Sequence, residues 1–336
     1  MHKVSDWFKR NRQTLIYILK RVGLLLLTFF LITTILFLLI RSLVPPITSY
    51  GAEMELEIAR REALGYNKPV IEQLFIFYKN IITKWDFGTS WKIAYLKDAN
   101  ALFVSALPYT ILINLYAVIL IIPSGIFMGI FQALHKNKVV DTILNVVVMI
   151  LISLPSFIIA LVLQYVLGYK AGLPMTTSSL YDAGGSFFSF PMLLSQILPV
   201  LALFIPSFAA LSRFTRAEMI ESLHSENVNF TRSVGVPEKK IIFHYALKNA
   251  LVPMLPMIIS LITGIFAGSI IIERVFSIPG AGLLMVNSIE KLDYDVFMVC
   301  AMFYTFIGLL TGLLIDITYT IVDPRIRIGG GKSYGK

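Results

Sequence analysis

The sequence has few reactive or charged side chains for its length of 336 residues. Its single cysteine, Cys300, excludes an intrachain disulfide and a metal site built from thiols. Charged residues make up only 15% of the chain, whereas soluble domains contain roughly 25%. Because 57% of the residues are hydrophobic, the composition excludes an ordinary water-soluble protein.

The hydrophobic residues are gathered in long uncharged runs. A helix needs roughly 20 apolar residues to cross a bilayer core of about 30 Å, and it satisfies its own backbone hydrogen bonds, as lipid requires. The runs cover residues 22–40, 99–134, 142–169, 183–212, 251–272 and 296–315. Their continuity excludes the short alternating strands of a membrane β-barrel. We therefore predict an all-α polytopic membrane protein with six transmembrane helices.

The runs and the charged segments between them predict how the chain is organised. Gly184, Gly185 and Pro191 are typical of a loop, so the fourth helix is expected to begin near Pro191. The predicted segments are a cytoplasmic tail (1–21), a first transmembrane helix (22–43), an external region (44–98), a five-helix transmembrane core (99–322) with a cytoplasmic loop (213–250), and a cytoplasmic tail (323–336).

The distribution of basic residues predicts the orientation. With six spans both termini lie on one side of the membrane, and most of the 29 lysine and arginine residues fall on that side. Because basic loops stay in the cytoplasm, we expect a multi-pass protein of the inner, cytoplasmic membrane with both termini inside. The net charge of +9 then reflects orientation. No nucleic-acid partner is predicted, since no basic stripe is interleaved with aromatic residues.

The loop 213–250 is the longest polar cytoplasmic segment, and its pattern predicts two short helices joined by a turn. Gly235 suits the left-handed position just past a helix end, and Pro237 suits the first position of the next helix. Glu238 is favourable at the positive end of that helix. The plain alternative is a surface hairpin that only joins two spans.

Parts of this loop have a specific sequence. Residues 229–235 read Asn-Phe-Thr-Arg-Ser-Val-Gly, and residues 244–253 read His-Tyr-Ala-Leu-Lys-Asn-Ala-Leu-Val-Pro. Together they resemble the cytoplasmic signature of the inner-membrane permease subunits of oligopeptide and dipeptide ABC importers. Other segments that resemble this family are residues 17–21, 64–69, 86–90, 273–282, 316–319 and 323–327. The chain departs from the family pattern at 45–47 and at 233–234.

The resemblance implies a type I ABC importer permease fold, in which a cytoplasmic coupling helix docks on an ATPase subunit. It implies that this role falls on His224, Asn229, Arg232, Gly235, Pro237 and Lys239. An outer gate would be formed by Phe276, Pro279, Gly280 and Gly282, with a plain turn as the alternative. The implied partners are a second homologous permease, two ATP-binding subunits, an extracellular peptide-binding protein, the peptide substrate and membrane lipid.

The sequence predicts no enzymatic site. The tail at 329–333 only resembles a phosphate loop, because Ile326 stands where the motif needs a glycine. Neither a Gly-x-Ser-x-Gly nor a His-Glu-x-x-His motif is present, which disfavours a membrane-embedded enzyme. We therefore expect no catalytic residue, metal or cofactor on this chain, with ATP and Mg²⁺ bound by partner subunits.

Polar residues within the runs are costly in lipid and tend to face the interior of a bundle. Asn114, Gln164 and Gln196 are expected either to form hydrogen bonds between helices or to line the pathway. The transported solute is expected to be a dipeptide or oligopeptide. Nickel chelates, glutathione and other small solutes remain alternatives within the same family.

Overall fold

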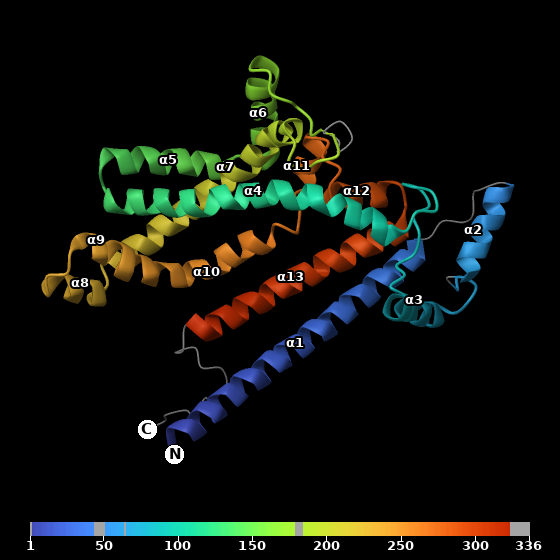
Figure 1. The fold of residues 1–336 in the computed structure, drawn as a ribbon, viewed down its shortest axis with the longest axis horizontal. Coiled ribbons are helices and arrows are strands. Elements are labelled where there is room, and N and C mark those ends of the chain that lie inside the picture. Colours follow the sequence, from blue (N-terminus) through green and yellow to red (C-terminus); the bar gives the residue numbers. More distant parts are fainter. Residues whose placement is uncertain (1, 44–50, 64, 179–183, 323–336) are drawn as a thin grey trace. The chain divides into compact units, whose positions relative to one another are not determined.

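A computed structural model describes residues 2–43, 51–63, 65–178 and 184–322. The expected C-terminal tail and the segment at 45–47 lie outside these ranges. The described chain is built from helices (Figure 1). It divides into two compact units, which are Met1–Pro108 with Ala281–Leu310 and Tyr109–Gly280 with Thr311–Lys336.

The helices are divided between the two units. The first unit contains α1 (His2–Leu43), α2 (Ala52–Ala63), α3 (Val70–Lys84), the start of α4 (Ala99–Leu134), α12 (Ala281–Glu290) and most of α13 (Tyr294–Val322). The second unit contains the rest of α4, α5 (Val139–Ser153), α6 (Ser156–Leu163), η1 (Gln164–Lys170), α7 (Phe190–Leu223), α8 (Glu226–Ser233), α9 (Glu238–Lys240), η2 (Ile241–Ala246), α10 (Leu247–Thr263) and α11 (Ile270–Val275). Both η1 and η2 are π-helical.

The structure confirms an all-α protein with apolar helices of membrane-spanning length. Five described segments are long and apolar enough to cross a bilayer: Ile16–Leu43, Ala99–Leu134, Phe190–Leu223, Glu238–Thr263 and Tyr294–Thr320. The pair formed by α5 with α6 and η1 counts as a sixth if it is one broken span. The fourth predicted helix begins at Phe190, next to Pro191, as expected.

The third apolar run is broken rather than straight. Between Ser153 and Ser156 the helix axis turns by 100° (Figure 1). Leu154 is extended (φ −78°, ψ 127°) because the ring of Pro155 disfavours helical geometry in the residue before it. Pro155 also lacks the N–H that a continuing helix needs, so α5 ends here and α6 begins anew.

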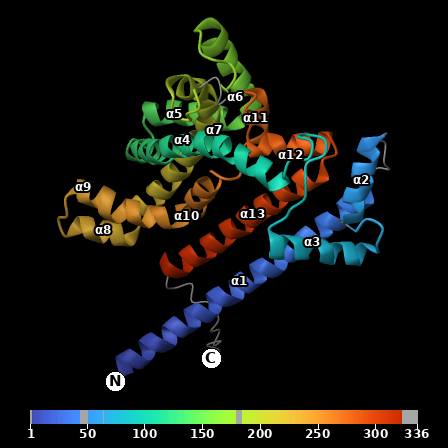
Figure 2. The ribbon, with the colours of Figure 1, turned by 45° about the vertical axis from the view of Figure 1, so that its right-hand side comes forward.

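In the first unit, α3 and α13 pack against α1. Phe37 and Ile40 of α1 form a buried cluster with Ile81 of α3 and with Met298 and Met302 of α13. Both ribbon views show α3 beside the later part of α1 (Figures 1 and 2). A second cluster joins the start of α4 to α12 and α13. The helices of this unit are therefore fixed by two apolar contacts.

In the second unit, α7 is the central helix, with α5, α6 and α10 packed against it. Its core includes Leu198 and Leu211 of α7, Ile113 of α4 and Met254 of α10. Helices α4 and α7 approach closely at Gly129, where an added Cβ would lie 2.6 Å from the backbone oxygen of Ser212. Small residues at such crossings are typical of membrane helices.

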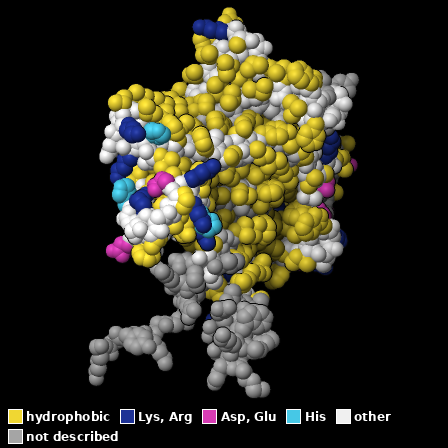
Figure 3. Space-filling model, turned by 60° about the vertical axis from the view of Figure 1, so that its left-hand side comes forward, with side chains coloured by type: hydrophobic (Ala, Val, Ile, Leu, Met, Phe, Trp, Pro, Cys, Tyr) yellow, Lys and Arg dark blue, Asp and Glu magenta, His cyan; other side chains and the backbone are white. Residues whose placement is uncertain are grey.

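Much of the outer surface is apolar. Hydrophobic side chains cover most of the face shown in Figure 3, whereas lysine, arginine and histidine side chains are gathered on its left-hand part. Leu24, Phe127 and Ile143 are examples of large hydrophobic residues that are more than half exposed. Such a surface is expected where a helix faces lipid instead of water.

Candidate functional site

The segment from His224 to Ala246 forms a compact helical hairpin. Helix α8 ends in a left-handed turn at Gly235, whose φ is 82°, as its sequence position predicts. The N–H of Gly235 donates to the carbonyl oxygen of Arg232 (3.1 Å) and that of Val236 to the carbonyl oxygen of Thr231 (3.4 Å). Pro237 lies one position earlier than predicted, because it caps α9 and Glu238 is the first helical residue.

Side chains of the predicted coupling residues hold the two arms of the hairpin together. The Arg232 guanidinium donates to both carboxylate oxygens of Glu238, at 2.9 and 3.2 Å, and to Asn229 Oδ1 at 3.2 Å. Asn229 Nδ2 in turn donates to the carbonyl oxygen of His224 (3.2 Å). Glu238 raises the pKa of Arg232. Asn229 and Arg232 of α8 therefore belong to the hydrogen-bond network that closes the turn between α8 and α9.

The inner face of the hairpin is packed onto the second unit. Val228 of α8 is fully buried with Met219 of α7 and Ile241 of η2. Ser222 Oγ donates to the carbonyl oxygen of Ala246 at 2.8 Å. These buried contacts fix α8 to α7 and η2.

The outer face of the hairpin carries unexpected apolar side chains. Phe230 is 70% exposed and Val234 63% exposed on an otherwise polar element. All six predicted coupling residues are exposed on the same hairpin. Exposed aromatic residues next to charged ones are typical of a protein interface. Neither Phe230 nor Val234 is among the site residues predicted from the sequence.

A second site lies at the turn after α11. The Glu273 carboxylate is fully buried, and Thr110 Oγ1 donates to its Oε1 at 2.9 Å. At Gly280 an added Cβ would lie 2.6 Å from both Glu273 Oε2 and Thr110 Oγ1, so a larger residue there would displace this buried pair. Glu273 begins the family-like segment 273–282 but is not among the predicted site residues, although a carboxylate directly after an apolar run is a visible signal.

The predicted gate residues follow one another through the turn after α11 and into α12. Phe276 is buried, and its carbonyl oxygen accepts from the N–H of Thr177 at 2.9 Å. Pro279 is exposed in the same turn, which also contains Gly280. Gly282 belongs to α12 in the other unit. A gating role for these residues stays a prediction.

The three predicted polar residues of the spans have different surroundings. Gln164 Nε2 donates to the carbonyl oxygens of Met175 (2.8 Å) and Val275 (3.1 Å), which ties η1 to α11. Asn114 Nδ2 donates to Thr110 within α4 at 2.8 Å. Gln196 is 2% exposed, and neither atom of its amide has a hydrogen-bond partner among the described residues. Only Gln164 therefore links two helical elements directly.

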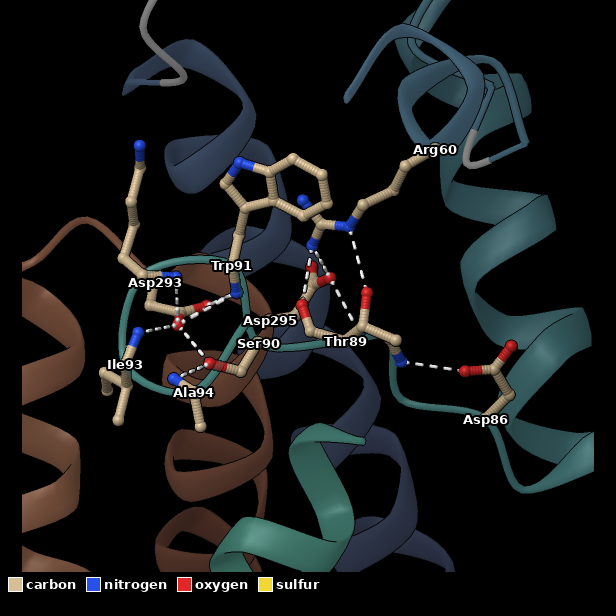
Figure 4. Close-up of polar contacts among 11 residues, drawn as sticks. Arg60, Asp86, Thr89, Ser90, Trp91, Ile93, Ala94, Asp293 and Asp295 are labelled. Atoms are coloured by element: carbon tan, nitrogen blue, oxygen red, sulfur yellow. Dashed lines mark hydrogen bonds and ion pairs between the residues drawn. The ribbon is translucent and has the colours of Figure 1, made fainter. Parts of the chain in front are cut away.

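The first unit contains two acidic residues that hold the segment 86–98 (Figure 4). Asp293 accepts the Ser90 hydroxyl at 2.6 Å. It also accepts the backbone N–H groups of Trp91, Lys92 and Ile93 at 3.1, 3.0 and 2.9 Å. Asp293 is only 1% exposed, and the hydrogen-bond donors that converge on its carboxylate compensate its charge.

Asp295 holds the neighbouring part of the same segment. It pairs with Arg60 of α2 and accepts the N–H of Thr89 at 3.2 Å. Arg60 also donates to the carbonyl oxygen of Thr89 at 2.8 Å. Gly88 has a φ of 92°, and an added Cβ there would lie 2.6 Å from Asp295 Cγ. The family-like segment 86–90 is therefore held in place by the carboxylates of Asp293 and Asp295.

Replacing Asp293 by alanine is expected to loosen the segment 86–98. The change leaves four donors without their acceptor, two of them on the buried residues Ser90 and Trp91, which costs about 3 kcal/mol of unfolding free energy. The thermal midpoint of the purified protein should fall, and protease should cut the segment faster. The control is Asp86→Ala, because Asp86 is exposed and its carboxylate accepts, among the residues that the structure describes, only the N–H of Gly88. Equal thermal midpoints for both variants would contradict the assignment.

The described residues contain no group of three metal-ligating side chains. A family model does match the chain: the binding-protein-dependent transport system inner membrane component, over residues 121–328. The chain belongs to this family. It is therefore an inner-membrane permease component. The matched range contains the hairpin, the turn after α11, Gln164 and Gln196, whereas Asn114 lies before it.

Named relatives match the permease over most of its length. The dipeptide permease protein DppB of Lactococcus lactis is 37% identical over 93% of this chain and 99% of its own. The oligopeptide permease protein OppB of Haemophilus influenzae is 34% identical over the same shares. A crystal structure of an amino acid ABC transporter with histidines has a TM-score of 0.45 and 19% identity, covering 66% of this chain and 94% of that one.

Proposed function

We propose that this permease forms, together with a second homologous permease, the membrane pathway of an ATP-driven importer of dipeptides or oligopeptides. The observation that carries the proposal is similarity along the whole chain: relatives matched over 93% of it are dipeptide and oligopeptide transport permeases. An extracellular peptide-binding protein delivers the solute. Two ATP-binding subunits hold ATP and Mg²⁺ and perform the hydrolysis.

The hairpin at 224–246 is the element on which an ATP-binding subunit docks. Its exposed Phe230 and Val234 supply apolar contact area, and Lys239 and Arg232 supply charge around them. Its buried face is fixed to α7 and η2, so closure of the ATP-binding pair moves the transmembrane helices. This assignment places the hairpin and both termini in the cytoplasm, in agreement with the distribution of basic residues.

Replacing Phe230 by alanine is expected to weaken binding of the ATP-binding subunits. Central aromatic contacts of an interface contribute about 2 kcal/mol or more, which is roughly 30-fold in affinity. Co-purification after a salt wash and ATP-driven uptake should both fall. The matched control is Phe188→Ala, since Phe188 is equally exposed at 70% but lies outside the hairpin. Equal loss in both variants would contradict docking at α8.

The class of solute is tested by competition. In proteoliposomes that contain the complete transporter, unlabelled dipeptides and oligopeptides should displace a labelled dipeptide, whereas glutathione and nickel chelates should not. Displacement by glutathione or a nickel chelate at lower concentration than by any peptide would assign the transporter to that solute instead.

A further inference from the structure

Helix α3 belongs to the region that the sequence assigns to the outside of the membrane, yet one apolar face of it is uncovered. Leu74, Phe77 and Ile81 face the core formed with α1 and α13. On the adjoining face, the exposed fractions are 70% for Ile71, 72% for Phe75 and 79% for Ile82, and Trp85 directly after the helix is 69% exposed. Their spacing of four, seven and three residues places them on one stripe of the helix.

The polar residues of α3 flank the stripe on the side away from the core. At about 100° per residue, Lys79 and Glu72 lie about 40° and 60° from Phe75, and Asn80 lies about 140° from it. The apolar part of the helix is therefore wider than the face of Leu74, Phe77 and Ile81 that packs on the core. It continues from that face into the exposed stripe without a charged residue between them. A helix at a water-facing surface would be expected to be polar there.

Contacts with α1 place this stripe at the depth of the bilayer. The Tyr78 hydroxyl lies 2.8 Å from Thr33 Oγ1 and 2.9 Å from Thr34 Oγ1, and its ring centroid is 5.0 Å from that of Phe30. These α1 residues lie within the span Ile16–Leu43. At 1.5 Å per residue, Thr33 is about 15 Å along the helix from Leu43, well inside the apolar run of α1.

The exposed side chains of α1 continue the same surface. Phe30, Leu31 and Ile35 are 47%, 49% and 56% exposed, and Phe30 is in contact with Tyr78. A bilayer that surrounds this part of α1 therefore also meets α3. The Tyr78 hydroxyl, which would be costly in hydrocarbon without a partner, is hydrogen-bonded to α1.

We propose that α3 is a membrane-inserted helix whose stripe of Ile71, Phe75 and Ile82 contacts lipid acyl chains in the leaflet at the Leu43 end of α1. Its 15 residues span about 22 Å and are too short to cross the bilayer, so the helix lies within one leaflet. Lys84 and Trp85 at its end suit the headgroup region. The inference needs only the membrane location of the permease and holds whichever solute is carried.

Spin labelling tests the proposal, because the chain offers one cysteine to remove. In a Cys300→Ala background, the variants Phe75→Cys and Ile82→Cys carry a nitroxide on the stripe. Thr83→Cys is the matched control, because Thr83 is exposed and lies on the polar side, about 100° from Ile82. Leu31→Cys on α1 is the lipid reference. Each variant is co-purified with its transporter subunits and reconstituted into liposomes. Collision with oxygen, which concentrates in lipid, is compared with collision with a water-soluble nickel chelate.

The proposal predicts that oxygen relaxes the labels at 75 and 82 several-fold more than the nickel chelate does, as at position 31, with the reverse order at 83. Stronger relaxation by nickel at 75 and 82 would place the stripe in water. Weak relaxation by both reagents would show that another protein surface covers it. Either of these two results overturns the proposal.

Discussion

Replacing Gly235 by proline is expected to abolish ATP-driven uptake while the permease still inserts into the membrane at a normal level. Gly235 has a φ of 82°, whereas proline fixes φ near −65°. The turn between α8 and α9 therefore cannot form, and the Arg232–Glu238 pair that closes it is lost. Because the hairpin lies outside the apolar runs, insertion should not change. The measurement compares uptake with the amount of permease in the membrane.

A second substitution at this position separates backbone geometry from bulk. A Cβ on Gly235 would meet no atom within 4 Å, and asparagine is tolerated in the left-handed region. Gly235→Asn is therefore expected to keep most of the uptake. Normal uptake by the proline variant would remove the turn from the coupling mechanism.

Replacing Gly129 by alanine is expected to destabilise the crossing of α4 and α7 strongly. The added Cβ would lie 2.6 Å from the Ser212 carbonyl oxygen and also collide with Thr215. Since the first of these atoms is backbone, the two helices have to separate. Overpacking of this kind costs about 2 kcal/mol. We expect a lower thermal midpoint in detergent and a smaller fraction of monodisperse protein.

Gly308→Ala is the control for this change. Gly308 also lies within an apolar helix, α13, and a Cβ added there meets nothing within 4 Å. Alanine at this position should be neutral or slightly stabilising, because glycine weakens a helix interior. If both variants melt at the same temperature, the close approach of α4 and α7 does not matter for stability.

The spans and the hairpin turn were predictable because each depends on local sequence. Apolar runs of the right length specify membrane helices, and glycine followed by proline specifies the end of α8 and the start of α9. The break at Pro155 is different. Pro199 and Pro206 lie inside α7 without ending it, so the presence of a proline within a span does not determine whether the helix breaks.

The missed residues depend on contacts between distant parts of the chain. Asp293 binds Ser90, which lies 203 residues earlier, and no local pattern links the two. Glu273 reaches Thr110 across 163 residues. The stripe on α3 was missed because its helix lies within a segment with many charges, which hydropathy averages treat as polar.

Uptake of a labelled peptide into proteoliposomes that contain the co-purified complex tests whether this permease belongs to an ATP-driven peptide importer. The measurement is made with and without internal ATP and with and without the peptide-binding protein. We expect uptake only when both are present. Failure of the permease to co-purify with any ATP-binding subunit, or uptake that is independent of ATP, would contradict it.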